Sequence, residues 1–193
     1  MHLSRRLAAS VSAVVLSSVA TAGCASDVTS SGGIVTGNGI TVVDGSKRVT
    51  PGPITGRTLG GKQVSLADYA GKVVVMNVWG SWCGPCRAEA KDLSTAAREL
   101  MPEGVVFLGI NTRDGDPATA LAFESSHDVP YPSIFDPGGR TLLAFHGTLL
   151  PSAIPTTVVI DAQGRVAARI LGPVPSAQTV VDLVDQVNKE SGS

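Results

Sequence analysis

The hydrophobic positions between residues 72 and 110 follow the spacing of a strand, a helix and a second strand. Residues 73–79 read Val-Val-Val-Met-Asn-Val-Trp, a nearly continuous apolar run typical of a strand covered on both faces. From Cys83 to Leu100, apolar residues recur at helical spacing, at Ala90, Leu93, Ala97 and Leu100. Residues 105–110 form the next apolar run. The pattern predicts a βαβ unit with a short turn before its helix.

Further elements are predicted on both sides of this unit. Residues 54–59 and 63–66 flank a Gly-Gly turn and predict a β-hairpin. Helices are predicted at about 116–126 and 177–188 and a short helical segment at about 141–146, with strands at 156–160 and 165–170. We therefore expect one α/β domain over residues 50–193. Its central mixed sheet should be flanked by helices, parallel in the middle and antiparallel at one edge.

The N-terminal residues 1–23 have the pattern of an export signal. Arg5 and Arg6 precede an uncharged stretch, residues 7–22, which is shorter than the roughly 20 apolar residues of a bilayer-spanning helix and is interrupted by Ser and Thr. Ala22-Gly23-Cys24 resembles the lipobox of bacterial lipoproteins, which implies a lipid on Cys24 and attachment to the outer face of the cytoplasmic membrane. The alternative is an ordinary signal peptide. Residues 24–49, rich in Ser, Thr and Gly, predict a flexible tether.

Charge and composition exclude some classes of function. The chain has 193 residues, of which 43% are hydrophobic, with 15 Lys and Arg against 16 Asp and Glu. Without a basic block there is no electrostatic basis for binding nucleic acid. Three cysteines cannot build a disulfide framework, so their positions in the chain matter more than their number.

Cys83 and Cys86 lie where the predicted buried strand gives way to the helix. A thiolate at a helix N-terminus faces unpaired N–H groups and the positive end of the helix dipole, which lowers the thiol pKa below its ordinary value of about 8.5. We expect Cys83 to be the nucleophile and Cys86, one helical turn along, to resolve a mixed disulfide on Cys83. Gly84 and Pro85 keep the ring small, and a proline suits the first helical turn.

Three other interpretations of this cysteine pair fit less well. A structural disulfide usually closes a long loop, and this pair closes almost none. A zinc site would need further ligands, whereas Cys24, His127 and His146 are scattered along the chain. Two buried free thiols would not require a strand-to-helix turn. We therefore expect thiol–disulfide redox chemistry with no metal or other cofactor, and a metal-carrying module is the less favoured alternative.

Trp79, the segment Trp82-Cys83-Gly84-Pro85-Cys86 and the residues Ile154-Pro155-Thr156-Thr157 before a strand together resemble the thioredoxin superfamily. Residues 62–71, the valine run after Lys72 and residues 132–164 are similar to its extracytoplasmic branch of TlpA, ResA and DsbE-type proteins. The resemblance implies a thioredoxin-like fold and a thiol–disulfide oxidoreductase that acts on protein thiols. The chain does not resemble the Sco copper chaperones, which have three residues between their cysteines, and it does not resemble the peroxiredoxins.

The same resemblance implies a physiological role. The leading one is reduction of disulfides, including those in apocytochrome c awaiting haem attachment, with electrons supplied by a membrane partner of the CcdA or DsbD type. The alternative is an oxidant of the DsbE or DsbF type that inserts disulfides into secreted proteins. Cys-Gly-Pro-Cys does not fix the direction, because the reduction potential depends on how far the fold stabilises thiolate and disulfide.

The resemblance also implies roles for residues around the cysteines. It implies a cis peptide bond between Ile154 and Pro155, which would place Ile154, Pro155 and Thr156 opposite Cys83 to bind an extended substrate segment. The alternative for Pro155 is an ordinary proline at a strand entry. Trp82 is expected to shield the site, unless it serves only in packing.

Glu89 and Asn77 are the remaining candidates near the site. Glu89 lies three residues after Cys86, where ResA-like reductases carry a glutamate, and the resemblance implies that it tunes the pKa of Cys86. The alternative is a solvated helix residue. Asn77 occupies the position at which cytoplasmic thioredoxins carry a buried acid, and the missing carboxylate fits the extracytoplasmic branch.

Overall fold

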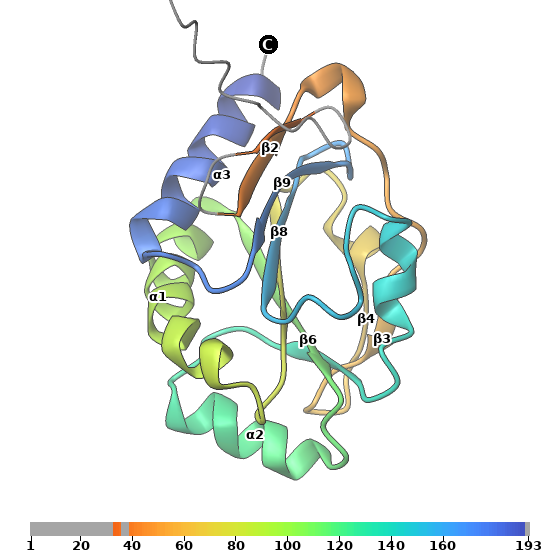
Figure 1. Ribbon diagram of the computed structural model, residues 1–193, viewed down its shortest axis with the longest axis vertical. Helices are drawn as coiled ribbons and strands as arrows, with labels where there is room; N and C mark the ends of the chain where they lie inside the picture. The colour runs from red at the N-terminus through yellow and green to blue at the C-terminus, as the bar shows by residue number, and fades with distance from the viewer. Residues whose placement is uncertain (1–32, 36–38, 192–193) are drawn as a thin grey trace, which may run out of the picture.

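A seven-stranded mixed sheet forms the centre of the computed structural model, which describes residues 33–35 and 39–191 (Figure 1). The strand order is β1-β2-β9-β8-β5-β6-β7. The strands are β1 (Gly33–Val35), β2 (Ile40–Val43), β5 (Val74–Trp79), β6 (Val106–Thr112), β7 (Ser133–Asp136), β8 (Thr156–Ile160) and β9 (Val166–Leu171). A separate hairpin pairs β3 (Thr55–Arg57) with β4 (Gln63–Ser65), as predicted.

Helices cover the sheet unequally. The three α-helices are α1 (Gly84–Leu100), α2 (Pro117–Ser126) and α3 (Ala177–Ser191), and the 3-10 segments are η1 (Gly45–Lys47), η2 (Leu66–Tyr69), η3 (Met101–Glu103) and η4 (Thr141–Phe145). In Figure 1, α1 and α3 lie side by side along one face of the sheet, while η4 and the β3–β4 hairpin lie on the other side. Within the described residues, no helix is long and apolar enough to cross a membrane.

Strand β5 divides the core into two layers because its side chains alternate in direction. Val75 packs with the α1 and α3 side chains, whereas Val74, Met76 and Val78 pack on the opposite face with Phe145. All six residues of the strand are buried, which confirms the strand expected from the β-branched run. Since Asn77 is two residues from Val75, its polar side chain is directed into the layer beneath α1.

One expectation about the sheet is wrong, and one strand of its parallel part was not predicted. The parallel pairs β5–β6 and β6–β7 form one side of the sheet, and the pairs from β5 through β8, β9 and β2 to β1 are antiparallel. The parallel part therefore includes an edge and is not central. Strand β7 was not expected, because its four residues follow a proline-rich stretch and have no period of their own.

The domain also begins before residue 50, which corrects the predicted extent of the tether. Strand β2 pairs with β9, and Arg48 is buried. Nη1 of Arg48 lies 3.3 Å from Asp161 Oδ2, and its Nη2 pairs with Glu190 of α3. Asp161 also pairs with Arg165 at 2.8 Å. The segment from Ile40 to Arg48 is thus part of the folded unit, while the predicted signal (1–23) and Cys24 lie outside the described residues.

Candidate active site

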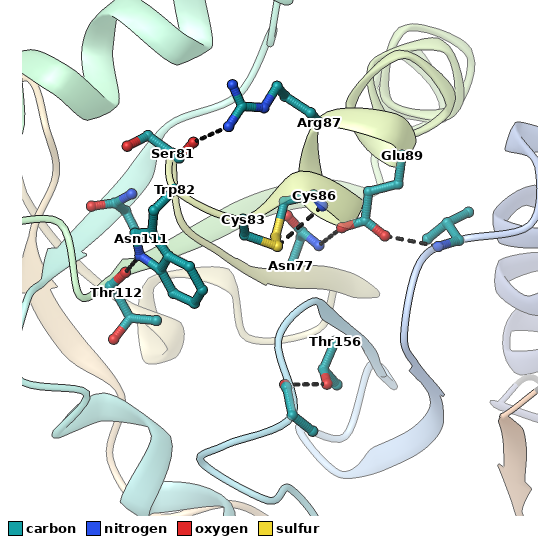
Figure 2. Close-up of a disulfide and its surroundings, with 12 residues drawn as sticks. Asn77, Ser81, Trp82, Cys83, Cys86, Arg87, Glu89, Asn111, Thr112 and Thr156 are labelled. Atoms are coloured by element: carbon teal, nitrogen blue, oxygen red, sulfur yellow. Dashed lines mark hydrogen bonds between the residues drawn. A yellow bond between two sulfur atoms is a disulfide. The ribbon is translucent and has the colours of Figure 1, made fainter.

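Cys83 and Cys86 form a disulfide at the junction of β5 and α1, with sulfur atoms 2.04 Å apart (Figure 2). Cys83 is the N-cap of α1, and its Sγ accepts a hydrogen bond from the Cys86 backbone N–H at 3.1 Å. Pro85 occupies the first turn, where a missing N–H costs nothing. Both cysteines are almost fully buried in this oxidised form, while Gly84 and Pro85 between them are exposed. The helix N-terminus is oriented to stabilise a thiolate on Cys83 after reduction.

Glu89 is buried on the inner face of α1 and is not solvated. Its Oε1 accepts from Asn77 Nδ2 at 2.9 Å, and its Oε2 accepts from the Val174 backbone N–H at 2.7 Å (Figure 2). Asn77 also donates to Thr157 Oγ1 at 3.2 Å. Burial raises the pKa of Glu89 to about 7, although the hydrogen bonds from Val174 and Asn77 oppose the rise. A carboxyl group that titrates near neutral pH therefore lies one helical turn from Cys86.

The loop before β8 lies against the disulfide. The Ile154–Pro155 peptide bond is cis, as the resemblance implies. Ile154 is half-buried and packs against the apolar cluster that contains both cysteines and Trp79. Thr156 is buried, and its Oγ1 donates to the Ala153 carbonyl at 2.7 Å, which closes the loop on itself (Figure 2).

Trp82 forms the exposed rim of the site. Its side chain is 47% exposed, and its Nε1 donates to the Thr112 carbonyl at 3.2 Å. Gly80 makes this position possible, because a Cβ there would overlap Trp82 Nε1 and lie 2.9 Å from Thr112 O. The ring therefore lies across the ends of β5 and β6, beside Cys83 and open to solvent on one side.

Comparison with known proteins assigns the chain to a family. A family model described as Redoxin matches residues 45–187. The chain belongs to the redoxin family. This redoxin is 38% identical to a DsbF homologue from Corynebacterium diphtheriae, whose crystal structure superposes with a TM-score of 0.72 over 78% of this chain and 94% of that chain. A secreted thiol-disulfide isomerase from Corynebacterium glutamicum is also 38% identical, with a TM-score of 0.71 over 77% of this chain and 93% of that chain.

The redoxin is similar to curated oxidoreductases over a shorter span. It is 30% identical to the thiol-disulfide oxidoreductase ResA of Bacillus cereus, over 59% of this chain and 63% of the relative. It is 35% identical to the thiol:disulfide interchange protein DsbE of Pseudomonas aeruginosa, over 58% of each chain. The match thus spans about three fifths of these relatives. The expected thioredoxin-like α/β fold is confirmed, and the redoxin is related to proteins of the ResA and DsbE type.

Sequence reasoning missed a polar anchor beneath the active-site loop of this redoxin. Asp114, in the loop after β6, accepts hydrogen bonds from Ser81 N at 2.9 Å, Ser81 Oγ at 2.5 Å and Asn111 Nδ2 at 2.6 Å. Asp114 is buried, so these bonds hold the residues just before Trp82 in place. A usable signal existed, because Asn111 lies at the end of buried strand β6 and Asp114 follows it, and β6 runs parallel to β5 and ends at the same edge of the sheet.

The two histidines named as candidate ligands lie in different segments, after α2 and after η4. The His127 ring stacks on Phe123 with ring centres 4.1 Å apart, and His146 is exposed after η4. No group of three or more His, Cys, Asp or Glu side chains among the described residues is arranged to hold a metal ion.

Proposed function

We propose that this redoxin is an extracytoplasmic thiol–disulfide oxidoreductase that acts on exported proteins. The observation that carries the proposal is the Cys83–Cys86 disulfide at the N-terminus of α1, beside the loop that contains cis-Pro155. A redox-active pair needs one sulfur that a substrate can reach and a second sulfur within bonding distance of the first. Cys86 is bonded to Cys83 in the oxidised form, so the second sulfur is in place. Cys83 is buried in this form, but its neighbours Trp82, Gly84 and Pro85 are exposed, so a substrate would reach its sulfur at this edge of the domain.

The reaction on a substrate disulfide takes two steps. The Cys83 thiolate attacks one substrate sulfur, forms a mixed disulfide and releases the other substrate sulfur as a thiolate. The Cys86 thiolate then attacks Cys83, releases the second substrate thiolate and closes the Cys83–Cys86 disulfide. Two electrons pass from the protein to the substrate, and the released thiolates take up protons from water. Ile154, Pro155 and Thr156 would align the substrate segment opposite Cys83.

Glu89 would act in the second step, as the base that removes the proton from Cys86. Its position three residues along α1 puts it on the same helix face as Cys86, and a pKa of about 7 lets it exchange protons near neutral pH. An ionised carboxylate here also disfavours a neighbouring thiolate. A dithiol pair becomes more oxidising when its thiolate is stabilised. Because ionised Glu89 destabilises the thiolate, it makes the pair less oxidising and favours a reductant.

Reduction of disulfides in exported proteins, apocytochrome c among them, is therefore the role we propose first. Its electrons would come from a membrane partner of the CcdA or DsbD type. The second candidate is an oxidant that forms disulfides in secreted proteins, which is supported by the likeness to the DsbF homologue of Corynebacterium diphtheriae.

The reduction potential of the Cys83–Cys86 couple separates these two roles. Equilibrating the protein with glutathione or dithiothreitol buffers would measure it. A value near or below about −270 mV, that of thioredoxin, supports the reductant, and a value near about −120 mV, that of DsbA, supports the oxidant. A pair that does not exchange with either buffer would contradict the oxidoreductase function itself.

We also propose that the mature protein is held at the outer face of the cytoplasmic membrane by a lipid on Cys24. Support comes from the small residues before Cys24 and from the likeness to a secreted isomerase of Corynebacterium glutamicum. The Cys24→Ala variant should move from the membrane fraction to the soluble fraction and keep its activity on substrates in solution. A Cys24→Ala variant that stays with the membrane would contradict lipid anchoring.

A further inference from the structure

Two arginines contact consecutive residues of the loop that leads to Cys83. Arg87, in the first turns of α1, donates from Nη2 to the Ser81 carbonyl at 3.1 Å (Figure 2). Arg113, in the loop after β6, places its guanidinium carbon 5.9 Å from the ring centre of Trp82. Both arginines and Trp82 are exposed. Together these three side chains form a surface beside Cys83 that is both cationic and aromatic, here called the Trp82 rim.

Arg113 also joins the Trp82 rim to the loop that contains the cis-proline. Its φ of 60° lies in the left-handed region, which residues with a side chain adopt mostly at special sites. From this position its Nη2 donates to the Pro151 carbonyl at 3.1 Å. Pro151 lies three residues before Ile154, so Arg113 connects the two loops that would border a bound substrate.

The acidic residues next to Arg113 are hydrogen-bonded to neutral groups and do not pair with the arginines of the rim. Asp114 is buried, and its two oxygens accept three hydrogen bonds from Ser81 and Asn111. Asp116 caps α2 by accepting from the Ala118 backbone N–H at 2.8 Å. Neither carboxylate forms an ion pair with Arg87 or Arg113, so the two exposed guanidinium groups keep N–H donors for a substrate carboxylate, although the whole chain has a net charge of −1.

We propose that the Trp82 rim recognises protein substrates that carry an aspartate or glutamate beside the reacting cysteine. This inference rests on the proposed function and adds a substrate class to it. The guanidinium of Arg113 has five N–H donors, and Nη2 supplies the one that meets Pro151. A substrate carboxylate would bind the remaining donors through charge-assisted hydrogen bonds while its backbone follows the loop toward Ile154. Rim charges act mainly on association, so the preference should appear in kcat/KM.

Two peptides that differ in one residue would test this preference. Each carries a single cysteine in a disulfide with a chromophoric thiol, and the residue next to the cysteine is Glu in one peptide and Lys in the other. The reduced protein converts each peptide disulfide to two thiols while Cys83 and Cys86 are oxidised, and the released chromophore reports the rate. At low ionic strength we expect kcat/KM to be about three- to tenfold higher for the Glu peptide. The ratio should fall towards one in about 1 M salt.

Charge reversal at Arg113 gives the decisive comparison. The Arg113→Glu variant should bring the ratio to one or below, and Arg113→Gln should give an intermediate ratio. Arg98→Glu is the matched control, because Arg98 is an exposed arginine in the last turn of α1, at the opposite end of that helix from Cys83, and the net charge changes equally. The control should keep the wild-type ratio.

The possible failures are distinguishable. Equal rates with both peptides, or an equal loss of preference in Arg98→Glu and Arg113→Glu, would overturn the substrate preference and leave the oxidoreductase function standing. Failure to reduce either peptide would remove the proposed function, and the preference with it.

Discussion

Replacing Glu89 with glutamine should remove a pH dependence of folding stability that we expect of the wild-type protein. Burial raises the pKa of Glu89 from 4.5 to about 7. Between these two pH values, Glu89 therefore keeps a proton in the folded protein that it releases in the unfolded chain. The folded state gains this stabilisation fully below about pH 4.5 and loses it as the pH rises through about 7. At about 1.4 kcal/mol for each pKa unit, the loss amounts to roughly 3 kcal/mol.

Glutamine can keep the hydrogen-bond contacts that Glu89 makes. Its carbonyl oxygen can accept from the Val174 N–H, and its amide can donate to the Asn77 oxygen if the Asn77 amide turns over and accepts from Thr157 as well. Because glutamine does not titrate, the stability of Glu89→Gln should change less between the two pH limits. At pH 7 and above, this variant should be more stable than the wild type.

Urea unfolding of the oxidised protein, followed from about pH 4 to about pH 8, would measure the difference. Glu99→Gln, at an exposed position of the same helix, is the matched control and should follow the wild-type profile. Parallel profiles for the wild type and Glu89→Gln would refute the argument, since they would mean that Glu89 does not titrate in the folded protein over this range.

Three further substitutions test other parts of the structure. Cys86→Ser should trap mixed disulfides between Cys83 and substrates, visible on non-reducing gels, and normal turnover by this variant would contradict the two-thiol mechanism. Arg48→Met removes a partner of buried Asp161 and should lower the free energy of unfolding by about 3 kcal/mol, measured in urea. Gly109→Ala places a Cβ against Ser133 Oγ and 2.9 Å from Trp79 Nε1, and should cost about 1–3 kcal/mol and change the tryptophan fluorescence. An unchanged midpoint in either stability experiment would contradict the packing described.

The elements that the sequence predicted well are those whose own residues carry a hydrophobic period. β5, α1 and β8 each bury a run of apolar residues that is visible without tertiary information. β2 was missed because its four residues lie in a stretch rich in Gly, Ser and Thr. This segment is stabilised by contacts with distant parts of the chain. Strand β2 pairs with β9, and Arg48 forms ion pairs with residues more than 100 positions away.

In the candidate site, too, some features could be predicted from local sequence and others could not. The cysteine pair and its place before α1 follow from local sequence, whereas the burial of Glu89 depends on Asn77 and Val174, which belong to β5 and to the segment before α3. Spacing along α1 left open whether Glu89 is solvated, since the partners of its carboxylate are set by the packing of three segments. Asp114 was missed for the same reason, because its role depends on where β6 ends relative to Ser81.

The register of β1 gives the molecule a direction relative to a membrane anchor. Gly33 pairs with Val43, and Ile40 with Ile170, so Gly33 lies at the end of the sheet remote from the start of β8 and the cis-proline loop. Gly33 is nine positions after Cys24 along the chain, a distance of at most about 30 Å. A lipid on Cys24 would thus attach the domain to the membrane through a short segment at the end of the sheet opposite the active site. Cys83 would then face away from the bilayer. The protein would meet only partners that approach from the side away from the bilayer or that extend beyond the bilayer surface.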